Sequence, residues 1–240
     1  VGYWKFENDY TDETSNSNDL NAIATPTFET DPAFTEEETY SLDLETGSND
    51  YVYIDDGDQT GLDITGDLTL ECWVKRESVD AVAVIMGKWS VADGNHSYLL
   101  YFEADNDLVF ITDADGTGGT SVTWTTPTIP VATWTHIAVT YDASEGSAEL
   151  FINGASVSTK TGLQNSIFDG TAKFRIGYPS TSFDGLIDEV RVWSDVRTDT
   201  EIANAYNDIL DPDTAGLVGY WRFENNYADI TDNNNWLIPA

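Results

Sequence analysis

The chain has 240 residues and carries 43 acidic against 10 basic side chains, which gives a formal net charge of −33. A surface this acidic repels nucleic acid and anionic membranes, which argues against both as partners. It favours cation binding or solubility at high salt, although a solvated acidic coat without a partner is the simpler explanation for most of the carboxylates. With 40% hydrophobic residues, the chain can form one all-β domain with a sizeable core.

Covalent crosslinks and membrane spans are both unexpected. Cys72 is the only cysteine and lies in a strand-like apolar run, so no disulfide can form within the chain and a buried, inert thiol is expected. No stretch reaches the ~20 apolar residues of a membrane span, and the first residues carry no signal peptide. The abrupt ends predict a piece of a longer protein.

Short alternating runs separated by turn residues predict an all-β chain. The expected strands are residues 1–6, 40–44, 51–54, 68–75, 81–88, 98–103, 108–112, 134–141, 148–152, 156–159, 174–177 and 186–193. Residues 22–39 and 89–97 are expected to be loops, and Asn153-Gly154 a tight hairpin. Thr198 and Glu201 form a capping box, which predicts a single helix over residues 199–209.

The last long strand carries an unusual carboxylate. Strict alternation places Asp188 on one face with Leu186, Val190 and Val192. A buried charge is costly unless it is paired or bound to a metal. Asp188 therefore lies either at a wet strand end or in a structural cation site.

Motifs along the chain resemble one family. In sequence order they are Gly2–Glu7, Ser48–Val52, Leu70–Val74, Trp134–Tyr141, Leu150–Gly154 and Phe183–Trp193. Over roughly residues 1–210 they are similar to the laminin-G-like, concanavalin A-like jelly rolls. The resemblance implies an all-β, concanavalin A-like jelly-roll sandwich of two antiparallel sheets with one short C-terminal helix.

The resemblance also implies a metal site. In the jelly rolls that the chain resembles, a structural calcium ion commonly joins the first strand, a nearby loop and a carboxylate of the last long strand. Carried over to this sequence, the ligands are Glu7, Asn8, the carbonyl of Gly47, and Asp188. Gly47 is the weakest match, because Glu45-Thr46-Gly47 departs from the usual Asp-Gly. The alternative for Glu7 is an exposed carboxylate at a strand end.

Two tryptophans are candidates for sugar binding, which uses aromatic faces and planar polar groups. Trp89 and Trp124 have polar, loop-like neighbours in the sequence. With Asn95, Tyr98 and Tyr101 they are predicted to form a glycan-binding patch. The alternative is that they pack beneath loops.

Catalytic motifs are missing from the sequence. Glycosidases on this fold resemble one another in a Glu-x-Asp-x-x-Glu strand, and residues 71–77 lack the middle aspartate. His96 and His136 are the only histidines, and neither accompanies a nucleophile motif. The sequence therefore predicts a protein that is not an enzyme.

One segment is repeated at a constant offset of 217. Residues 218–225 match residues 1–8, and Tyr227, Asp229, Thr231 and Leu237 match Tyr10, Asp12, Thr14 and Leu20. The preferred interpretation is a tandem repeat, with a jelly roll over residues 1–210, a linker over 211–217 and the start of a second repeat over 218–240. The alternative is that residues 218–240 are an extra strand docked on the first domain, so that both copies belong to one domain.

Together these features predict a non-catalytic, calcium-stabilised module for adhesion or carbohydrate binding. It would lie outside the cell or on its surface, within a larger multidomain protein. Its partner would be a glycan or a cell-surface protein, alongside neighbouring repeats of the same chain. The alternative is a structural spacer or protein-interaction module that binds no sugar. Exposure of Trp89 and Trp124 together on one surface would distinguish the two.

Overall fold

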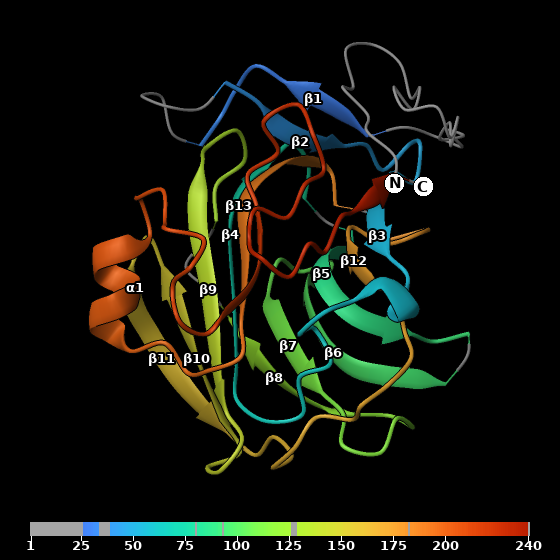
Figure 1. Cartoon of the computed structure of the whole chain (residues 1–240), viewed down its shortest axis with the longest axis vertical. Helices are drawn as coiled ribbons and strands as arrows, with labels where there is room; N and C mark the ends of the chain where they lie inside the picture. The colour runs from blue at the N-terminus through green and yellow to red at the C-terminus, as the bar shows by residue number, and fades with distance from the viewer. Residues whose placement is uncertain are drawn as a thin grey trace.

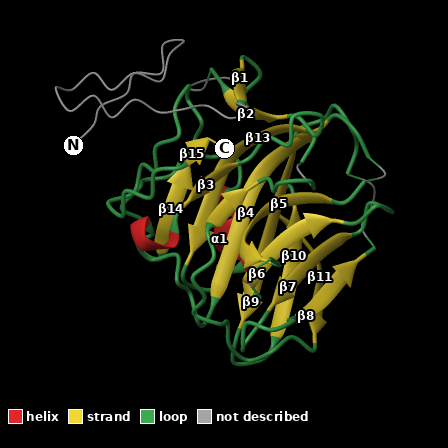
Figure 2. Cartoon of the chain, turned by 90° about the vertical axis from the view of Figure 1, so that its right-hand side faces the viewer, coloured by secondary structure: helices red, strands yellow, loops and turns green. Residues whose placement is uncertain are grey.

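The structure is a computed structural model that describes residues 26–33, 39–79, 81–92, 94–125, 129–181 and 183–239. In these residues two antiparallel sheets pack face to face, and a short helix lies outside them (Figures 1 and 2). The predicted all-β sandwich with one helix is confirmed. No helix in these ranges is long and apolar enough to cross a membrane.

Hydrogen bonding defines the order of the strands in each sheet. The eight-stranded sheet runs β1 (Thr27–Glu29), β2 (Ser41–Leu44), β13 (Gly185–Trp193), β4 (Leu68–Arg76), β9 (Thr135–Asp142), β10 (Ser147–Ile152) and β11 (Ala155–Thr161), and β14 (Leu217–Trp221) also pairs with β13. The seven-stranded sheet runs β15 (Ile238–Pro239), β3 (Val52–Ile54), β12 (Phe174–Ile176), β5 (Ala83–Ser90), β6 (Asn95–Phe102), β7 (Leu108–Thr112) and β8 (Thr120–Trp124). A 3-10 turn covers Asp56–Asp58.

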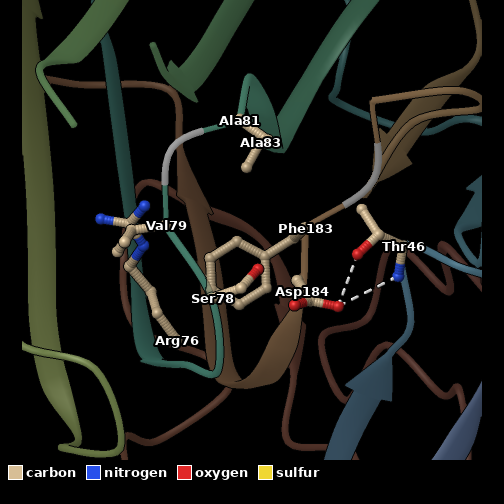
Figure 3. A pocket seen from close by; sticks show the side chains of 8 residues that line it. All are labelled: Thr46, Arg76, Ser78, Val79, Ala81, Ala83, Phe183 and Asp184. Carbon is tan, nitrogen blue, oxygen red and sulfur yellow. Dashed lines mark hydrogen bonds between the residues drawn. The ribbon is translucent and has the colours of Figure 1, made fainter. Parts of the chain in front are cut away.

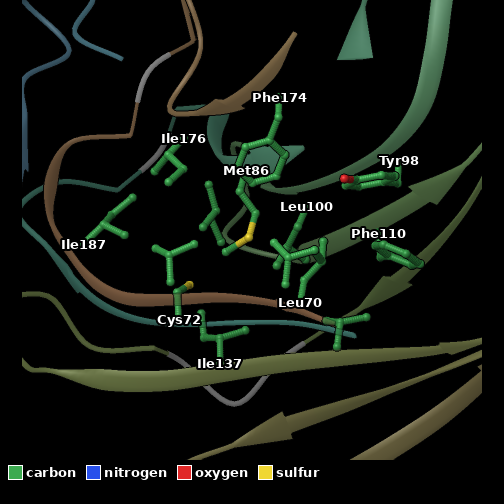
Figure 4. Packing of buried hydrophobic residues seen from close by; sticks show 14 of the residues in the cluster. Leu70, Cys72, Met86, Tyr98, Leu100, Phe110, Ile137, Phe174, Ile176 and Ile187 are labelled. Atoms are coloured by element: carbon green, nitrogen blue, oxygen red, sulfur yellow. The ribbon is translucent and has the colours of Figure 1, made fainter. Parts of the chain in front are cut away.

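The main core lies between the two sheets (Figure 4). β4 shows how the sequence builds it, because its predicted alternation is confirmed: Leu68, Leu70, Cys72 and Val74 all point into the core. Burial raises the pKa of the Cys72 thiol and keeps it protonated. Side chains at the intervening positions lie on the outer side of each sheet, where a functional surface has to be sought.

The helix α1 (Asp199–Ala205) covers the outer side of the eight-stranded sheet (Figure 1). Thr198 and Glu201 form the predicted capping box. Ile202 packs on Ala138 and Phe151 of the sheet. The helix ends at Ala205, one turn earlier than predicted, since Ile202 is its only buried residue.

A bulge in β13 changes the predicted faces of that strand. Glu189 has a positive φ of 48°, and the pairing with β4 shifts register between Asp188 and Arg191. Ile187 points into the core before the bulge, and Val190 and Val192 do so after it. Asp188 is therefore not on the face of the two valines. Strict alternation gave the wrong result because a bulge of one residue exchanges the two faces.

The second copy of the repeated segment belongs to this sandwich. β14 pairs with β13, with Arg191 opposite Tyr220, and β15 pairs with β3. Trp221 and Phe223 lie in the main core and are at most 1% exposed. These pairings correspond to the alternative in which residues 218–240 dock on the first domain. The first copy lies outside the described residues.

Candidate functional site

Asp188 lies at a break between two neighbouring strands. β13 pairs with β2 through Gly185–Ile187 and with β14 from Val190 onward, and Asp188 lies between the two pairings. Its carboxylate is fully buried and accepts backbone N–H groups of Ala33 (3.0 Å) and Glu189 (2.8 Å). Burial raises the pKa of Asp188 well above its usual range. Asp188 is therefore a buried carboxylate, which excludes the alternative that it lies at a solvent-exposed strand end.

Gly47 does not lie beside Asp188. It occupies an exposed turn, in which the Thr46 hydroxyl donates to Asp184 (2.6 Å). Asp184 precedes Asp188 by four residues, or roughly 13 Å along a strand. The structure does not bring Gly47 beside Asp188, because β2 runs antiparallel to β13 and leads to a turn at the start of β13.

Glu224 supplies a second carboxylate near Asp188. Its two oxygens accept the backbone N–H of Thr39 (2.9 and 3.1 Å). Burial raises the pKa of Asp188 most, the charge of Glu189 raises it further, and the charge of Glu224 adds a smaller increase. The predicted ligands Glu7 and Asn8 lie outside the described residues. Calcium takes roughly six to eight oxygen ligands. In the described part of the chain no three His, Cys, Asp or Glu side chains gather to hold a metal ion, so these side chains alone do not complete the site.

Two of the five predicted glycan-binding residues belong to the core. Tyr98 and Trp124 are at most 2% exposed, and the Trp124 indole donates to the Ser158 carbonyl (3.0 Å). Neither offers a face to a sugar, so the prediction is wrong for both. Trp124 was expected in a loop because of its polar neighbours, but Ser121 and Thr123 are the outward residues of β8. Trp89 and Trp124 are therefore not exposed together on one surface, so the feature that would distinguish a glycan-binding module from a spacer does not favour glycan binding by these two residues.

Trp89 and Tyr101 lie on the outer side of the seven-stranded sheet, whereas Asn95 pairs with Ser90 at the start of β6 and donates to the Thr171 hydroxyl (2.6 Å). Trp89 packs with Val84 and Leu99 in a small apolar cluster that is separate from the main core. Tyr101 and Tyr178 are half-buried and pack against this cluster. Trp89 itself is only 7% exposed. It therefore lies beneath Tyr101 and Tyr178, which form the accessible surface.

The strand register extends this surface across the sheet. Tyr53 of β3 lies opposite Arg175 of β12, which lies opposite Gly87 of β5. Gly87 is opposite Leu99, and Leu99 is opposite Ile111. We call the surface formed by Tyr53, Trp89, Tyr101, Arg175 and Tyr178 the aromatic face. The sequence signal for it was the alternation of core and non-core residues in β3 and β12, which places Tyr53 and Arg175 outward.

Positive charges accompany the aromatic face, although basic residues are few in this chain. The Arg175 guanidinium lies 5.2 Å from the ring centre of Tyr178 and donates to the Trp89 carbonyl (2.8 Å). The Lys173 ammonium lies 3.7 Å from the ring centre of Tyr53 and is paired with the Asp55 carboxylate (2.7 Å). Such cation–π contacts hold long basic side chains in place. The face thus combines flat aromatic surfaces with fixed hydrogen-bond donors.

A polar corner made of Asn95, His96 and Ser97 adjoins the aromatic face. The His96 ring stacks on Trp89, with 4.1 Å between centroids and 5° between planes. Asn95 Oδ1, Ser97 Oγ and both His96 ring nitrogens are buried and have no hydrogen-bond partner among the described residues, His96 Nδ1 lying 3.5 Å from Asp113 Oδ2. Buried polar atoms nearly always find a partner. The corner therefore has spare hydrogen-bonding capacity beside Trp89.

Two buried carboxylates on the other sheet, Glu71 and Glu189, lie around Arg191, and Glu189 also contacts the partly buried Arg222 (3.3 Å). Arg191 contacts Glu189 (2.6 Å) and Glu71 (3.9 Å), His136 Nε2 lies 3.1 Å from Glu71, and the Tyr220 hydroxyl donates to Glu189. Apart from Arg222, these side chains are at most 2% exposed. Burial would raise the pKa of Glu71, but the His136 contact and the Arg191 charge lower it below its usual value. This network is paired and closed to solvent, so it gives a substrate no access.

A small pocket opens at the start of β13 (Figure 3). It is lined by Thr46, Arg76, Ser78, Val79, Ala81, Ala83, Phe183 and Asp184. Burial would raise the pKa of Asp184, but hydrogen bonds from Ser78 and Thr46 lower it. The Arg76 guanidinium lies over the Phe102 ring (4.2 Å) and donates to Asn106. The two charged groups of the pocket are therefore already held by the protein.

The two antiparallel sheets, their strand order and the single helix define a jelly roll of the concanavalin A-like class. Residues 46–203 match the family model described as the Concanavalin A-like lectin/glucanases superfamily. This match covers more than half of the chain, and the chain belongs to that superfamily. Among curated proteins, none matches the chain.

Solved structures share the fold at low sequence identity. A putative carbohydrate binding protein from Bacteroides ovatus is 18% identical with a TM-score of 0.61; the alignment covers 95% of this chain but only 62% of that protein. Domain 4 of AbnA, an extracellular arabinanase from Geobacillus stearothermophilus solved with arabinotriose, is 19% identical with a TM-score of 0.58, covering 86% of this chain and 97% of that domain. A SAP-like pentraxin from Limulus polyphemus is 15% identical with a TM-score of 0.57, covering 92% and 97%.

Proposed function

We propose that this chain is a carbohydrate-binding module and that sugar rings bind on the aromatic face. The observation that carries the proposal is the set of half-buried tyrosines Tyr53, Tyr101 and Tyr178, gathered with Arg175 on the outer side of one sheet. The carbohydrate binding named for the Bacteroides ovatus protein, and the arabinotriose complex of the AbnA domain, support a sugar as the ligand.

The chemistry of this face suits a neutral or acidic sugar. The apolar C–H face of a pyranose or furanose ring packs on an aromatic ring, and a tyrosine adds a hydroxyl at its rim. A guanidinium presents several donors in a fixed plane, which can bind hydroxyl or carboxylate oxygens of a ligand. Arg175 is held by Tyr178 and the Trp89 carbonyl, so little side-chain entropy is lost when it binds.

We propose that the module acts without catalysis, as an adhesive or sugar-binding part of an extracellular or cell-surface protein. Support for a non-catalytic role comes from the closed network around Arg191, which leaves Glu71 and Glu189 paired and buried. The AbnA domain is one domain of an extracellular enzyme, and this similarity supports an extracellular location within a larger protein.

We also propose that calcium binds at Asp188 and stabilises the fold. The support is a fully buried carboxylate that accepts two backbone N–H groups of the described residues and lies near a second carboxylate, Glu224. An ionised carboxylate in such a place is stabilised by a cation. Ligands beyond these two residues have to come from backbone carbonyls or from residues outside the described ranges.

A glycan array tests the sugar proposal. The full chain should bind one or more glycans, and the double variant Tyr101→Ala/Tyr178→Ala should weaken binding by about 3- to 10-fold for each ring removed. Trp236→Ala is the matched control, because Trp236 is a 45% exposed aromatic residue outside the aromatic face. A chain that binds no glycan, or a double variant that binds as well as the control, would favour a spacer or protein-interaction module instead.

A further inference from the structure

The repeated segment is conserved within the chain at the positions that the fold uses. We compare residues 1–22, the N-terminal copy, with residues 218–239, the C-terminal copy, which are identical at 13 of 22 positions. Every buried position of the C-terminal copy except Pro239 is among the identical ones. The exposed positions differ: Ile230 and Trp236, which are 38% and 45% exposed, correspond to Glu13 and Asp19.

Apolar anchors fix the C-terminal copy in the sandwich. Five aromatic or aliphatic side chains are at most 4% exposed: Tyr220, Trp221, Phe223, Tyr227 and Leu237. The Trp221 ring stacks on Phe174 (5.3 Å between centroids) and its indole donates to the Asn235 carbonyl (2.8 Å). The same residue types stand at the corresponding positions of the N-terminal copy, Tyr3, Trp4, Phe6, Tyr10 and Leu20.

Buried polar anchors are repeated as well. Asp229 accepts the backbone N–H groups of Tyr220 (3.0 Å), Thr231 (2.9 Å) and Asn235 (2.9 Å). The fully buried Asn235 amide exchanges two hydrogen bonds with the backbone of Thr60, at 2.6 and 2.8 Å. Identical residues stand at the corresponding positions, Asp12, Thr14 and Asn18. A polar network of this kind is costly unless every member is present, so its repetition points to the same environment for both copies.

The N-terminal copy can reach the site that the C-terminal copy occupies. The Tyr227 hydroxyl donates to the Pro26 carbonyl (3.2 Å), and the Tyr227 carbonyl accepts from Leu237 N (3.1 Å). Pro26 thus contacts the side chain of Tyr227, and Leu237 contacts its backbone. The position corresponding to Leu237 is Leu20, and the six residues from Leu20 to Pro26 span up to about 20 Å.

We propose that one slot in the sandwich serves two segments of the same chain. This repeat slot is formed by β13, β3, Thr60 and Phe174, and the C-terminal copy fills it in the structure. The N-terminal copy is its second occupant and takes the slot when the C-terminal copy leaves. The sandwich can therefore be completed from either end of the chain, and the displaced copy becomes free to bind elsewhere.

Disulfide trapping in the full chain identifies the occupant. Ile238 lies opposite Tyr53, so Tyr53→Cys/Ile238→Cys should crosslink within one chain and serves as the control. The corresponding residue of the N-terminal copy is Asn21. Tyr53→Cys/Asn21→Cys should crosslink weakly in the otherwise unchanged chain and strongly when Trp221→Ala weakens the C-terminal copy. Cys72 is fully buried and does not interfere.

Thermal unfolding supplies an independent readout. Removing a buried tryptophan from a chain of this size lowers the melting temperature by roughly 6 to 10 °C. Because the other copy replaces the damaged one, Trp221→Ala alone should lower the melting temperature by less than about 3 °C. Trp4→Ala alone should leave the melting temperature unchanged. The double variant Trp4→Ala/Trp221→Ala should show the full loss. The full loss in Trp221→Ala alone, without a 21–53 disulfide, would overturn the proposal. A disulfide-linked dimer would overturn exchange within one chain, because the copy would then come from a second molecule.

Discussion

Replacing Arg191 by methionine should destabilise the protein strongly. The guanidinium is 1% exposed and bonds Glu189, the carbonyls of Ala205 (3.1 Å) and Asp208 (2.6 Å), and Tyr220. Breaking a buried ion pair on one side costs about 3–5 kcal/mol, because the remaining charge stays buried. An unfolding entropy of about 2.1 cal/mol/K per residue gives ~0.5 kcal/mol/K for this chain. The melting temperature should therefore fall by roughly 6 to 10 °C at pH 7.

A matched double variant separates the charge from the packing. In Arg191→Met the buried Glu189 carboxylate keeps Arg222 (3.3 Å) and the Tyr220 hydroxyl but loses its buried cation. In Arg191→Met/Glu189→Gln this carboxylate becomes a neutral amide, so the loss should be smaller than in Arg191→Met alone. Calorimetry or circular dichroism at constant calcium measures both variants. A loss below about 1 kcal/mol in the single variant, or a greater loss in the double variant, would refute the view that this network is a structural device that neutralises charge.

Three further perturbations test other parts of the structure. Asp188→Asn should lower the melting temperature in calcium and leave it unchanged or raised in EDTA; an equal loss in both would refute the metal role. Because burial raises the pKa of Asp43 to about 6 and raises that of Asp188 as well, the folded state binds protons more tightly than the unfolded chain. In EDTA the melting temperature should therefore rise as the pH falls from about 7 through 6 towards 5, and a fall over this interval would contradict it. Gly185 has φ +131°, and a methyl group there would collide with the Lys75 carbonyl. Gly185→Ala should therefore lower the free energy of unfolding by about 2–4 kcal/mol. Gly47 has open space around it, so the control Gly47→Ala should change the free energy of unfolding by less than about 0.5 kcal/mol.

The parts of the fold that local patterns determine could be predicted from the sequence. The alternation of β4 gave its core face, and Asn153-Gly154 gave a hairpin in which both residues have positive φ, 49° and 75°. The capping box at Thr198 gave the start of the helix. Each of these signals lies within a few neighbouring residues, so no long-range information was needed.

The candidate site depends on long-range contacts that the sequence does not show. Trp124 looked like a loop residue because its neighbours are polar, but those neighbours are the outward side of an edge strand. The bulge at Glu189 has no local signature, and it decides on which side Asp188 lies. Tyr53 and Arg175 come together only through the pairing of β3 with β12, which are far apart in the chain.

The central claim is that the aromatic face binds carbohydrate, and a hydrogen-exchange footprint with the tightest glycan found on the array tests it most directly. Saturating ligand should slow exchange in peptides that cover β6 and β12 together with Tyr178, and the slowing should disappear in Arg175→Ala. Protection confined to the pocket at Asp184, or to the outer side of the eight-stranded sheet, would contradict the claim.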